Sequence, residues 1–215
     1  MTVIAVVGDL HGRYDIAHRV LEEYDDVVFI GDYVDSFTES VDIQIKTLDL
    51  VLKAKNDNPG RVHVLIGNHE RSYMDIKCRA SGWNPATQIH MNDRMDELEK
   101  LKHHLFLENF LLTHAGVTDR AIGNMRLDEY LSQGDHDIVG YARGGHYPIG
   151  GLLWCDWYRE FKEMDGISQV VGHSAYREGP EKGILKMGNS FNIDCLDNVN
   201  EILLIENGEG TIVPI

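Results

Sequence analysis

Short apolar runs that end at glycine, repeated three times in the first 70 residues, restrict the fold of this chain more than any other feature. The runs cover residues 3–7, 27–30 and 62–66, and each is followed by Gly-Asp or Gly-Asn. Between them, residues 16–24 and 41–52 carry apolar side chains at helical spacing. Short buried strands joined by helices pair in parallel. The sequence therefore predicts an α/β fold that begins β-α-β-α-β.

The rest of the chain is less regular and becomes β-rich towards its end. An apolar stripe from Met91 to Leu105 predicts a helix, and the six glycines from residue 134 to residue 151 predict a long loop. Because no repeat or linker interrupts the chain, residues 1–215 are expected to form one domain. Strands are expected over residues 110–113, 170–171, 184–187, 191–195 and 202–205, with hairpin turns at Gly188-Asn189 and Asn207-Gly208.

A potential metal ligand stands beside glycine at the end of five predicted strands. The carboxyl ends of parallel strands meet at one edge of a sheet, and glycine there lets the chain turn sharply and a ligand approach closely. One Gly-Asp pair is usually only a turn, but a turn does not explain five such groups in the same position. The groups are Gly8-Asp9-Leu10-His11-Gly12, Gly31-Asp32-Tyr33-Val34-Asp35, Gly67-Asn68-His69-Glu70, His114-Ala115-Gly116 and Gly172-His173.

The side chains in these groups suit two divalent metal ions. Oxygen and imidazole donors without thiolate favour manganese, iron, zinc or cobalt over copper or an iron–sulfur cluster. Two such ions close together can bind a phosphoryl group and the water that attacks it. We expect one site at Asp9, His11 and Asp32 and a second at Asp32, Asn68, His114 and His173, with Asp32 shared between them.

In order along residues 3–175, these motifs resemble those of the calcineurin-like metallophosphoesterase superfamily, and specifically its serine/threonine phosphoprotein phosphatase branch. That branch carries GDxHG, GDxVDRG, GNHE, a later His-Ala/Gly-Gly and a Gly-His. The segment Leu152-Leu153-Trp154-Cys155-Asp156 is also similar to its LLWSD segment. The resemblance implies a four-layer αββα sandwich, in which two mixed sheets pack face to face, helices flank them, and the two-metal site lies at one edge.

The resemblance also implies roles for residues around the metal ligands. His69 matches the general acid that protonates the leaving oxygen, and Asp35 matches the carboxylate that orients its imidazole. Glu70 completes the GNHE motif, and we expect its role to be structural. The six expected metal ligands match those of the family position by position.

Two departures from the family pattern concern the substrate. Ser36 follows Asp35, and Ile66 precedes Gly67, where the family has arginine in both places. Serine and isoleucine cannot grip phosphate oxygens in the bidentate way that arginine does, so discrimination against diesters is expected to be weak. Substrate contacts are expected instead from a set of side chains for each of which a solvated surface position is the alternative: Arg71, Arg159, Arg143 and His146.

The expected function is that of a dimetal phosphoesterase that uses metal-activated water, with manganese as the favoured metal. The resemblance points to a phosphorylated protein as substrate, as for a serine/threonine phosphoprotein phosphatase. The missing arginines keep open a small phosphorylated or nucleotide substrate, as for a nucleotide phosphodiesterase or a dinucleoside polyphosphate hydrolase. A non-catalytic metal-binding scaffold is a further alternative, but the presence of both His69 and Asp35 argues against it.

The charge and the cysteines exclude other classes of function. Twenty Lys and Arg against 35 Asp and Glu give a formal net charge of −15. Such a surface repels duplex nucleic acid and anionic bilayers, so neither partner is expected. Cys78, Cys155 and Cys195 are too few and too widely spaced for a disulfide framework or a thiolate zinc site. The opening apolar run is too short for a signal peptide, and a cytoplasmic location is expected.

Overall fold

The computed structural model describes residues 3–175 and 183–215, which form two five-stranded sheets and the helices around them. Within these residues, no helix combines the length and the apolar character needed to cross a membrane. The first part of the chain contains β1 (Ile4–Val7), α1 (Tyr14–Glu23), β2 (Asp26–Phe29), α2 (Val41–Asp57), β3 (Val62–Val64), α3 (Asn68–Met74), the 3-10 helix η1 (Ile76–Cys78), α4 (Pro85–Asn92) and α5 (Met95–Leu98). The second part contains β4 (His104–Leu107), β5 (Phe110–Thr113), α6 (Asp119–Ile122), α7 (Leu127–Gln133), the 3-10 helix η2 (Tyr141–Arg143), β6 (Ser168–Val171), β7 (Leu185–Met187), β8 (Ser190–Asn192), β9 (Glu201–Glu206) and β10 (Glu209–Pro214).

Both sheets are mixed, with parallel strands at their centres. The first has the order β10-β9-β1-β2-β3, in which β1, β2 and β3 are parallel and β9 and β10 are antiparallel neighbours. The second has the order β4-β5-β6-β8-β7, in which β5, β6 and β8 are parallel and β4 and β7 pair antiparallel at the edges. The parallel β-α-β-α-β start predicted from the sequence is confirmed.

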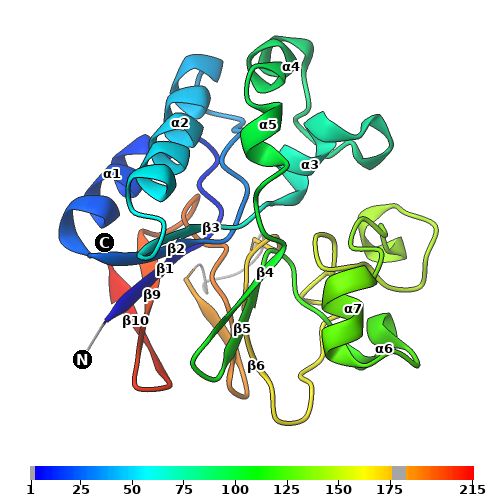
Figure 1. Ribbon diagram of the computed structural model, residues 1–215. Helices are drawn as coiled ribbons and strands as arrows, with labels where there is room; N and C mark the ends of the chain where they lie inside the picture. Colours follow the sequence, from blue (N-terminus) through cyan, green and yellow to red (C-terminus); the bar gives the residue numbers. More distant parts are fainter. Residues whose placement is uncertain (1–2, 176–182) are drawn as a thin grey trace.

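The two sheets pack face to face, and helices cover their outer faces (Figure 1). Helices α1 and α2 cover the first sheet, and α6 and α7 lie against the second. This is the predicted four-layer αββα sandwich. The core between the sheets consists of apolar side chains from both of them: Val6, Val28, Ile30, Leu65, Leu203 and Ile205 from the first sheet and its strand ends, and Phe110, Leu112, Val170, Phe191 and Ile193 from the second.

Burial on both faces explains why the strands appear in the sequence as continuous apolar runs. On β2, Val28 faces the other sheet, whereas Val27 and Phe29 belong to the core beneath the helices. On β1, Val6 faces the other sheet while its neighbours face the helices. A strand at the middle of this sandwich therefore has no solvent-facing side on which polar residues would alternate.

The helix predicted from Met91 to Leu105 is wrong. Helix α4 ends at Asn92, α5 ends at Leu98, and Leu105 lies on β4 opposite Leu112. Met91 and Leu98 enter the same core from two short helices, which preserves helical spacing across the break. Strands β4 and β10 were not predicted, because edge strands bury few side chains and so lack a long apolar run.

Close approach of the strand ends requires glycine at two points. A Cβ added at Gly67, after β3, would lie 2.1 Å from Asp32 Oδ1, and one added at Gly172, after β6, would lie 2.1 Å from Asp9 Oδ1. The first contact joins neighbouring strand ends of one sheet, and the second joins the two sheets. These glycines therefore allow carboxylates to gather where the strands end.

We expect Gly67→Ala to lower the free energy of unfolding by about 1–3 kcal/mol, the usual cost of overpacking. The backbone φ of −101° suits alanine, so the loss would come from the close contacts with Asp32 and with Glu70 Oε2, which a Cβ would approach to 2.9 Å. Urea unfolding followed by circular dichroism measures the change. Gly60→Ala is the matched control, since a Cβ there meets no atom within 4 Å. Equal stability of the two variants would contradict the argument.

Candidate functional site

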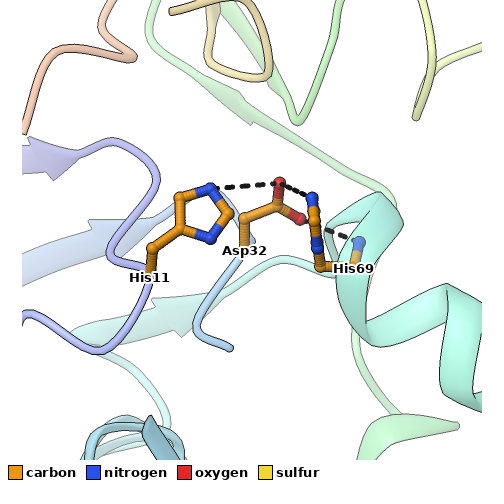
Figure 2. A group of neighbouring side chains, drawn as sticks. All are labelled: His11, Asp32 and His69. Carbon is orange, nitrogen blue, oxygen red and sulfur yellow. Dashed lines mark hydrogen bonds and ion pairs between the residues drawn. The ribbon is translucent and has the colours of Figure 1, made fainter. Parts of the chain in front are cut away.

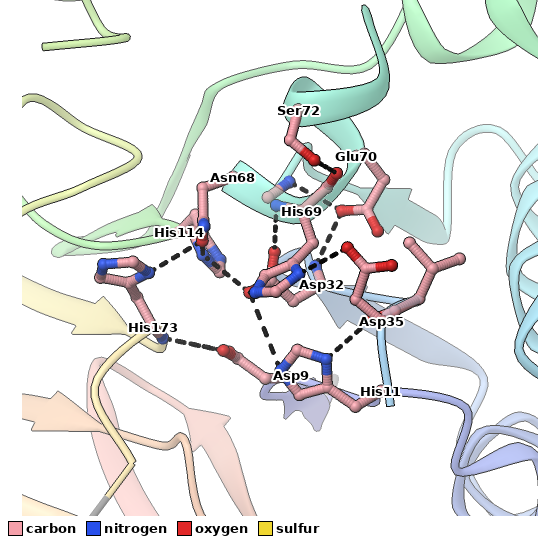
Figure 3. Close-up of polar contacts among 12 residues, drawn as sticks. Asp9, His11, Asp32, Asp35, Asn68, His69, Glu70, Ser72, His114 and His173 are labelled. Carbon is pink, nitrogen blue, oxygen red and sulfur yellow. Dashed lines mark hydrogen bonds and ion pairs between the residues drawn. The ribbon is translucent and has the colours of Figure 1, made fainter. Parts of the chain in front are cut away.

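The carboxyl ends of parallel strands from both sheets supply the site (Figure 3). Asp9 follows β1, Asp32 follows β2, and Asn68 begins α3 after β3. From the second sheet, His114 follows β5 and His173 follows β6. These five side chains point towards one another, and the side chains of His11 and His69 belong to the same cluster.

Asp32 lies at the centre of this group and is 1% exposed. Its Oδ2 is 3.3 Å from His114 Nε2, 3.8 Å from His69 Nε2 and 3.9 Å from His11 Nε2. Figure 2 shows this oxygen between the rings of His11 and His69. The other carboxylate oxygen, Oδ1, accepts the backbone N–H of His69 at 3.0 Å. The Asp32 carboxylate therefore lies close to three imidazole rings.

Backbone carbonyls orient two of these rings. His11 Nδ1–H donates to the carbonyl of Val34 at 2.7 Å, and His114 Nδ1–H donates to that of Ile30 at 3.1 Å. Each hydrogen bond places the proton on Nδ1 and directs Nε2 towards Asp32. Metal-ligating histidines are held in this way.

Asn68 and His173 complete the second-sheet side of the site. The amide oxygen of Asn68 lies 2.7 Å from His114 Nε2 and 2.8 Å from His173 Nδ1. Both carboxylate oxygens of Asp9 accept the N–H of His173, at 3.2 and 3.0 Å. Within the described residues, the buried Nε2 of His173 has no hydrogen-bond partner.

Four of the site residues have backbone conformations that side chains disfavour. The φ angles are 40° at His11, 56° at Asp32, 64° at Asp35 and 66° at His173. Left-handed backbone at residues other than glycine costs about 1–3 kcal/mol each and persists where the surroundings impose it. The strand-end turns thus aim these side chains into the site at some cost in stability.

Glu70 supplies the contacts that hold the Asp32 turn. Its fully buried carboxylate accepts the N–H groups of Asp32 at 2.9 Å, Tyr33 at 2.8 Å and Gly67 at 3.1 Å. Three charge-assisted hydrogen bonds to backbone offset the strain of that turn. Its contacts are those of the structural residue expected from the sequence.

His69 is held by Asp35, whose carboxylate and backbone N–H are each held by a further side chain. Its Nδ1 lies 2.8 Å from Asp35 Oδ2, so its Nε2 faces Asp32. The hydroxyl of Tyr73 donates to Asp35 Oδ1, and the Asp35 N–H donates to Gln44 Oε1 at 2.7 Å. Tyr73 was not predicted from the sequence, although its position four residues after His69 in a helix places both on one face.

The pKa values of the two buried aspartates, Asp9 and Asp32, are shifted in opposite directions. Burial, followed by the charges of Asp194 and Asp32, raises the pKa of Asp9 well above its usual range. Burial also opposes the charge of Asp32, but the neighbouring histidines hold its pKa well below its usual range. Burial and the charge of Arg143 lower the pKa of His173, which keeps its imidazole neutral as a metal ligand requires.

The donor set fits divalent metal ions. Ligand atoms within 4.8 Å of one another form two groups, His11 with Asp32 and His69, and Asp32 with His114 and His173. Asp32 belongs to both groups. Asp9, predicted for the first site, lies outside both groups, and its oxygens accept the His173 N–H. A cation here would offset the repulsion between Asp9 and Asp32.

A cleft of about 620 Å³ opens beside these groups and has an acidic wall. Asp194 and Asp197 line it, and burial, opposed by His11 and aided by Asp32, raises the pKa of Asp194 to about 6. Asp194 was not predicted as a site residue, although it lies within a predicted strand, because no glycine marks that strand's end. Asp197 and Arg79 also line the cleft and were not predicted from the sequence.

Of the arginines expected to contact substrate, Arg143 lines the cleft. Arg71 is paired with Asp137, with Nε 2.8 and 2.9 Å from its oxygens, and lines a different hollow. Arg159 is exposed and does not line the cleft. His146 is also exposed and lines a hollow that adjoins the cleft.

The two positions where arginine is replaced lie in different surroundings. Ser36 lines the cleft. Ile66 is 1% exposed, belongs to the core beneath the helices, and borders a hollow other than the cleft. Of the two departures, the one at Ser36 therefore bears directly on the charge of the cleft.

We expect His69 in the metal-free protein to stay protonated through neutral pH. Burial opposes its charge, but Asp32 and the hydrogen bond to Asp35 outweigh burial and raise the pKa of His69 to about 9. The imidazolium should therefore be lost only as pH rises through about 9. Histidine ring ¹⁵N shifts measured against pH should show this midpoint.

Asp35→Asn removes one of these charges and should lower the midpoint by about 1–3 units. Asp49→Asn, a change at the exposed partner of Arg94, is the matched control and should leave it unchanged. A midpoint near 6.5 in the wild-type protein would contradict the assignment.

Comparison with known proteins identifies the family to which this chain is similar. The family model of calcineurin-like phosphoesterases matches residues 2–200. A probable serine/threonine-protein phosphatase of Encephalitozoon cuniculi is 40% identical over 165 residues, which cover 71% of this chain and 33% of that protein. The serine/threonine-protein phosphatase PP2A-like PPG1 of Saccharomyces cerevisiae is 38% identical over 77 residues, 32% of this chain and 19% of its own. The chain spans a third or less of these two relatives.

Solved structures share the fold. A cold-active protein-tyrosine phosphatase of a psychrophilic Shewanella species has a TM-score of 0.68 at 16% identity, covering 100% of this chain and 78% of that one. A protein serine/threonine phosphatase from Saccharomyces cerevisiae has a TM-score of 0.62 at 15% identity, covering 100% and 80%. Together with the match over residues 2–200, these findings show that the chain belongs to the calcineurin-like phosphoesterases, which are metal-dependent hydrolases of phosphate esters.

Proposed function

We propose that this chain hydrolyses phosphate monoesters on serine or threonine side chains of proteins, using a centre of two divalent cations. The observation that carries the proposal is the position of Asp32, whose carboxylate belongs to two groups of metal-binding side chains at once. The names of the two curated relatives support a phosphoprotein as substrate. In this proposal, residues 1–215 form one domain that carries this activity.

Six side chains would hold the cations in this proposal. Two bound cations would polarise the phosphoryl group and make water more acidic. Manganese is the favoured metal, and iron, zinc and cobalt suit the same donors. One cation would be held by Asp9, His11 and Asp32, and the other by Asp32, Asn68, His114 and His173.

His69 and Asp35 would supply the proton for the leaving oxygen. Asp35 accepts the proton of His69 Nδ1 in a hydrogen bond. In the imidazolium form, the second proton is on Nε2, which faces Asp32 Oδ2, and this is the proton that would be donated. Tyr73 binds the Asp35 carboxylate and Gln44 binds the Asp35 backbone N–H, and both contacts hold in place the residue that orients the imidazole. Both residues of the pair are buried, which excludes water from the hydrogen bond between them.

Of the arginines considered above, Arg143 is the one we propose as a substrate contact. Its Nη2 donates to the carbonyl of His173 at 3.1 Å and to Ser174 Oγ at 2.7 Å, which fixes it beside a metal ligand. The exposed His146 and the arginines at 71 and 159 are left without a role in catalysis. A cytoplasmic location remains part of the proposal, and the free, buried state of all three cysteines is consistent with it.

Ser36 supports a second candidate, hydrolysis of a nucleotide diester or anhydride. A serine on the cleft in place of arginine reduces the cationic charge available to a dianionic monoester. Manganese-loaded protein should be assayed against a phosphoserine peptide, bis-p-nitrophenyl phosphate and a dinucleoside tetraphosphate. Faster turnover of either of the last two would favour the second candidate, and no turnover of any would favour a non-catalytic scaffold.

Asp32→Asn should weaken both metal sites together, because the variant removes the charge that they share while Oδ1 remains an acceptor for the His69 N–H. Elemental analysis after dialysis should find less than one metal ion per chain, against two in the wild-type protein. Asp15→Asn, at an exposed carboxylate, is the control. Two tightly bound ions in Asp32→Asn would disprove the shared position.

His69→Asn should slow an alkyl phosphate far more than p-nitrophenyl phosphate, whose leaving group needs little help from an acid. General acid catalysis contributes about 10²–10⁴-fold, and that loss should appear in kcat for the alkyl ester. His18→Asn, at an exposed histidine on α1, serves as the control. Equal losses on both esters, with metal content unchanged, would remove His69 from this role.

A further inference from the structure

The cleft has few permanent positive charges with which to bind a phosphoryl group. Asp9, Asp32, Asp194 and Asp197 line it, and cations at the metal groups would offset part of their charge. Among the described residues of its lining, the permanently charged cations are Arg79 and Arg143. Both also line the adjoining hollow of about 550 Å³, so they lie at the junction of the two spaces.

Arg143 is already engaged by the protein. Its Nε lies 3.0 Å from Asp156 Oδ2, and its Nη2 donates to His173 and Ser174. The Asp156 carboxylate therefore offsets much of the charge that Arg143 could present to a substrate. A second cation is needed to replace the arginine that the family carries at position 36.

Arg79 has a different environment, because an aromatic ring holds it instead of a carboxylate. Its guanidinium carbon lies 3.8 Å from the centroid of the Trp83 ring, and within the described residues Arg79 forms no ion pair. The Trp83 indole is fixed in turn, since its Nε1–H donates to Gln88 Oε1 at 3.1 Å and its ring stacks on Tyr73 at 6.1 Å. Stacking holds one face of a guanidinium and leaves its in-plane N–H donors available.

The loop that carries Arg79 is attached to the catalytic pair. A Cβ added at Gly82, whose φ is +93°, would lie 3.0 Å from Asp35 Cβ, so the loop passes directly against that residue. The N–H of Asn84 donates to the Tyr73 hydroxyl at 3.2 Å, and that hydroxyl donates to Asp35. Arg79 therefore stands on the side of the cleft where Ser36 follows Asp35.

We propose that Arg79, stacked on Trp83, binds the non-bridging oxygens of the substrate phosphoryl group and replaces the arginine missing at Ser36. The inference rests on the proposed phosphatase function. Planar guanidinium donors match two phosphoryl oxygens, whereas the cleft's other arginine is partly neutralised. Because the contact is to the phosphoryl group, it is independent of the alcohol to which that group is attached.

The test is Arg79→Ala in manganese-loaded protein. KM for p-nitrophenyl phosphate and for a phosphoserine peptide should rise about tenfold to hundredfold and by the same factor, the loss expected for a charge-assisted contact. The Kd of inorganic phosphate, measured by calorimetry, should rise equally. Arg79→Lys should lie between alanine and wild type, and Trp83→Leu should raise Kd by a smaller factor with Arg79 intact.

Arg126→Ala is the matched control, because Arg126 is exposed and pairs with Asp128 elsewhere on the surface. KM and Kd within twofold of wild type in Arg79→Ala would overturn the proposal. A loss confined to the peptide, with phosphate affinity unchanged, would place Arg79 on the leaving group and would also overturn it. A wild-type protein that binds phosphate but hydrolyses neither ester would refute the phosphatase function, while the calorimetry would still decide the role of Arg79.

Discussion

The buried carboxylate of Asp32 is the interaction on which the rest of the site depends. Three imidazole nitrogens lie within 3.9 Å of its Oδ2, and these histidines keep it ionised despite burial. A buried charge needs such compensation, since burial alone strongly favours the neutral form. Its left-handed backbone is equally dependent on a neighbour, because Glu70 binds the N–H groups on both sides of the turn. Charge and conformation at this one residue are thus supported by both sheets and α3.

The face-to-face packing of the sheets makes this convergence possible. The first sheet supplies Asp9 and Asp32, and the second supplies His114 and His173. An apolar core lies between the sheets away from the site, while glycine at Gly172 lets the strand ends approach until backbone nearly touches the carboxylate of Asp9. Metal binding at residues from both sheets would therefore also stabilise the sandwich itself, because the ligands do not gather in an unfolded chain.

Aromatic contacts organise the substrate side of the cleft. Trp83 contacts both Arg79 and Tyr73, and Tyr73 in turn binds Asp35. A change at Trp83 would reach both the proposed phosphate contact and the carboxylate that orients His69. The acidic character of the chain, with a net charge of −15, makes such local cations more important, since the surrounding field repels a phosphate.

The sequence by itself determined the parallel α/β core and most of the side chains in the candidate metal-binding groups, because buried strands appear as apolar runs and strand ends as Gly-Asp or Gly-Asn-His. It did not reveal β4 and β10, whose edge positions leave them without such runs, or the break between α4 and α5. Only the tertiary structure decided that Arg79 reaches the cleft while Arg71 turns to Asp137. The motifs show which residues stand at each strand end. The direction of a long flexible side chain, in contrast, depends on neighbours that are distant in sequence.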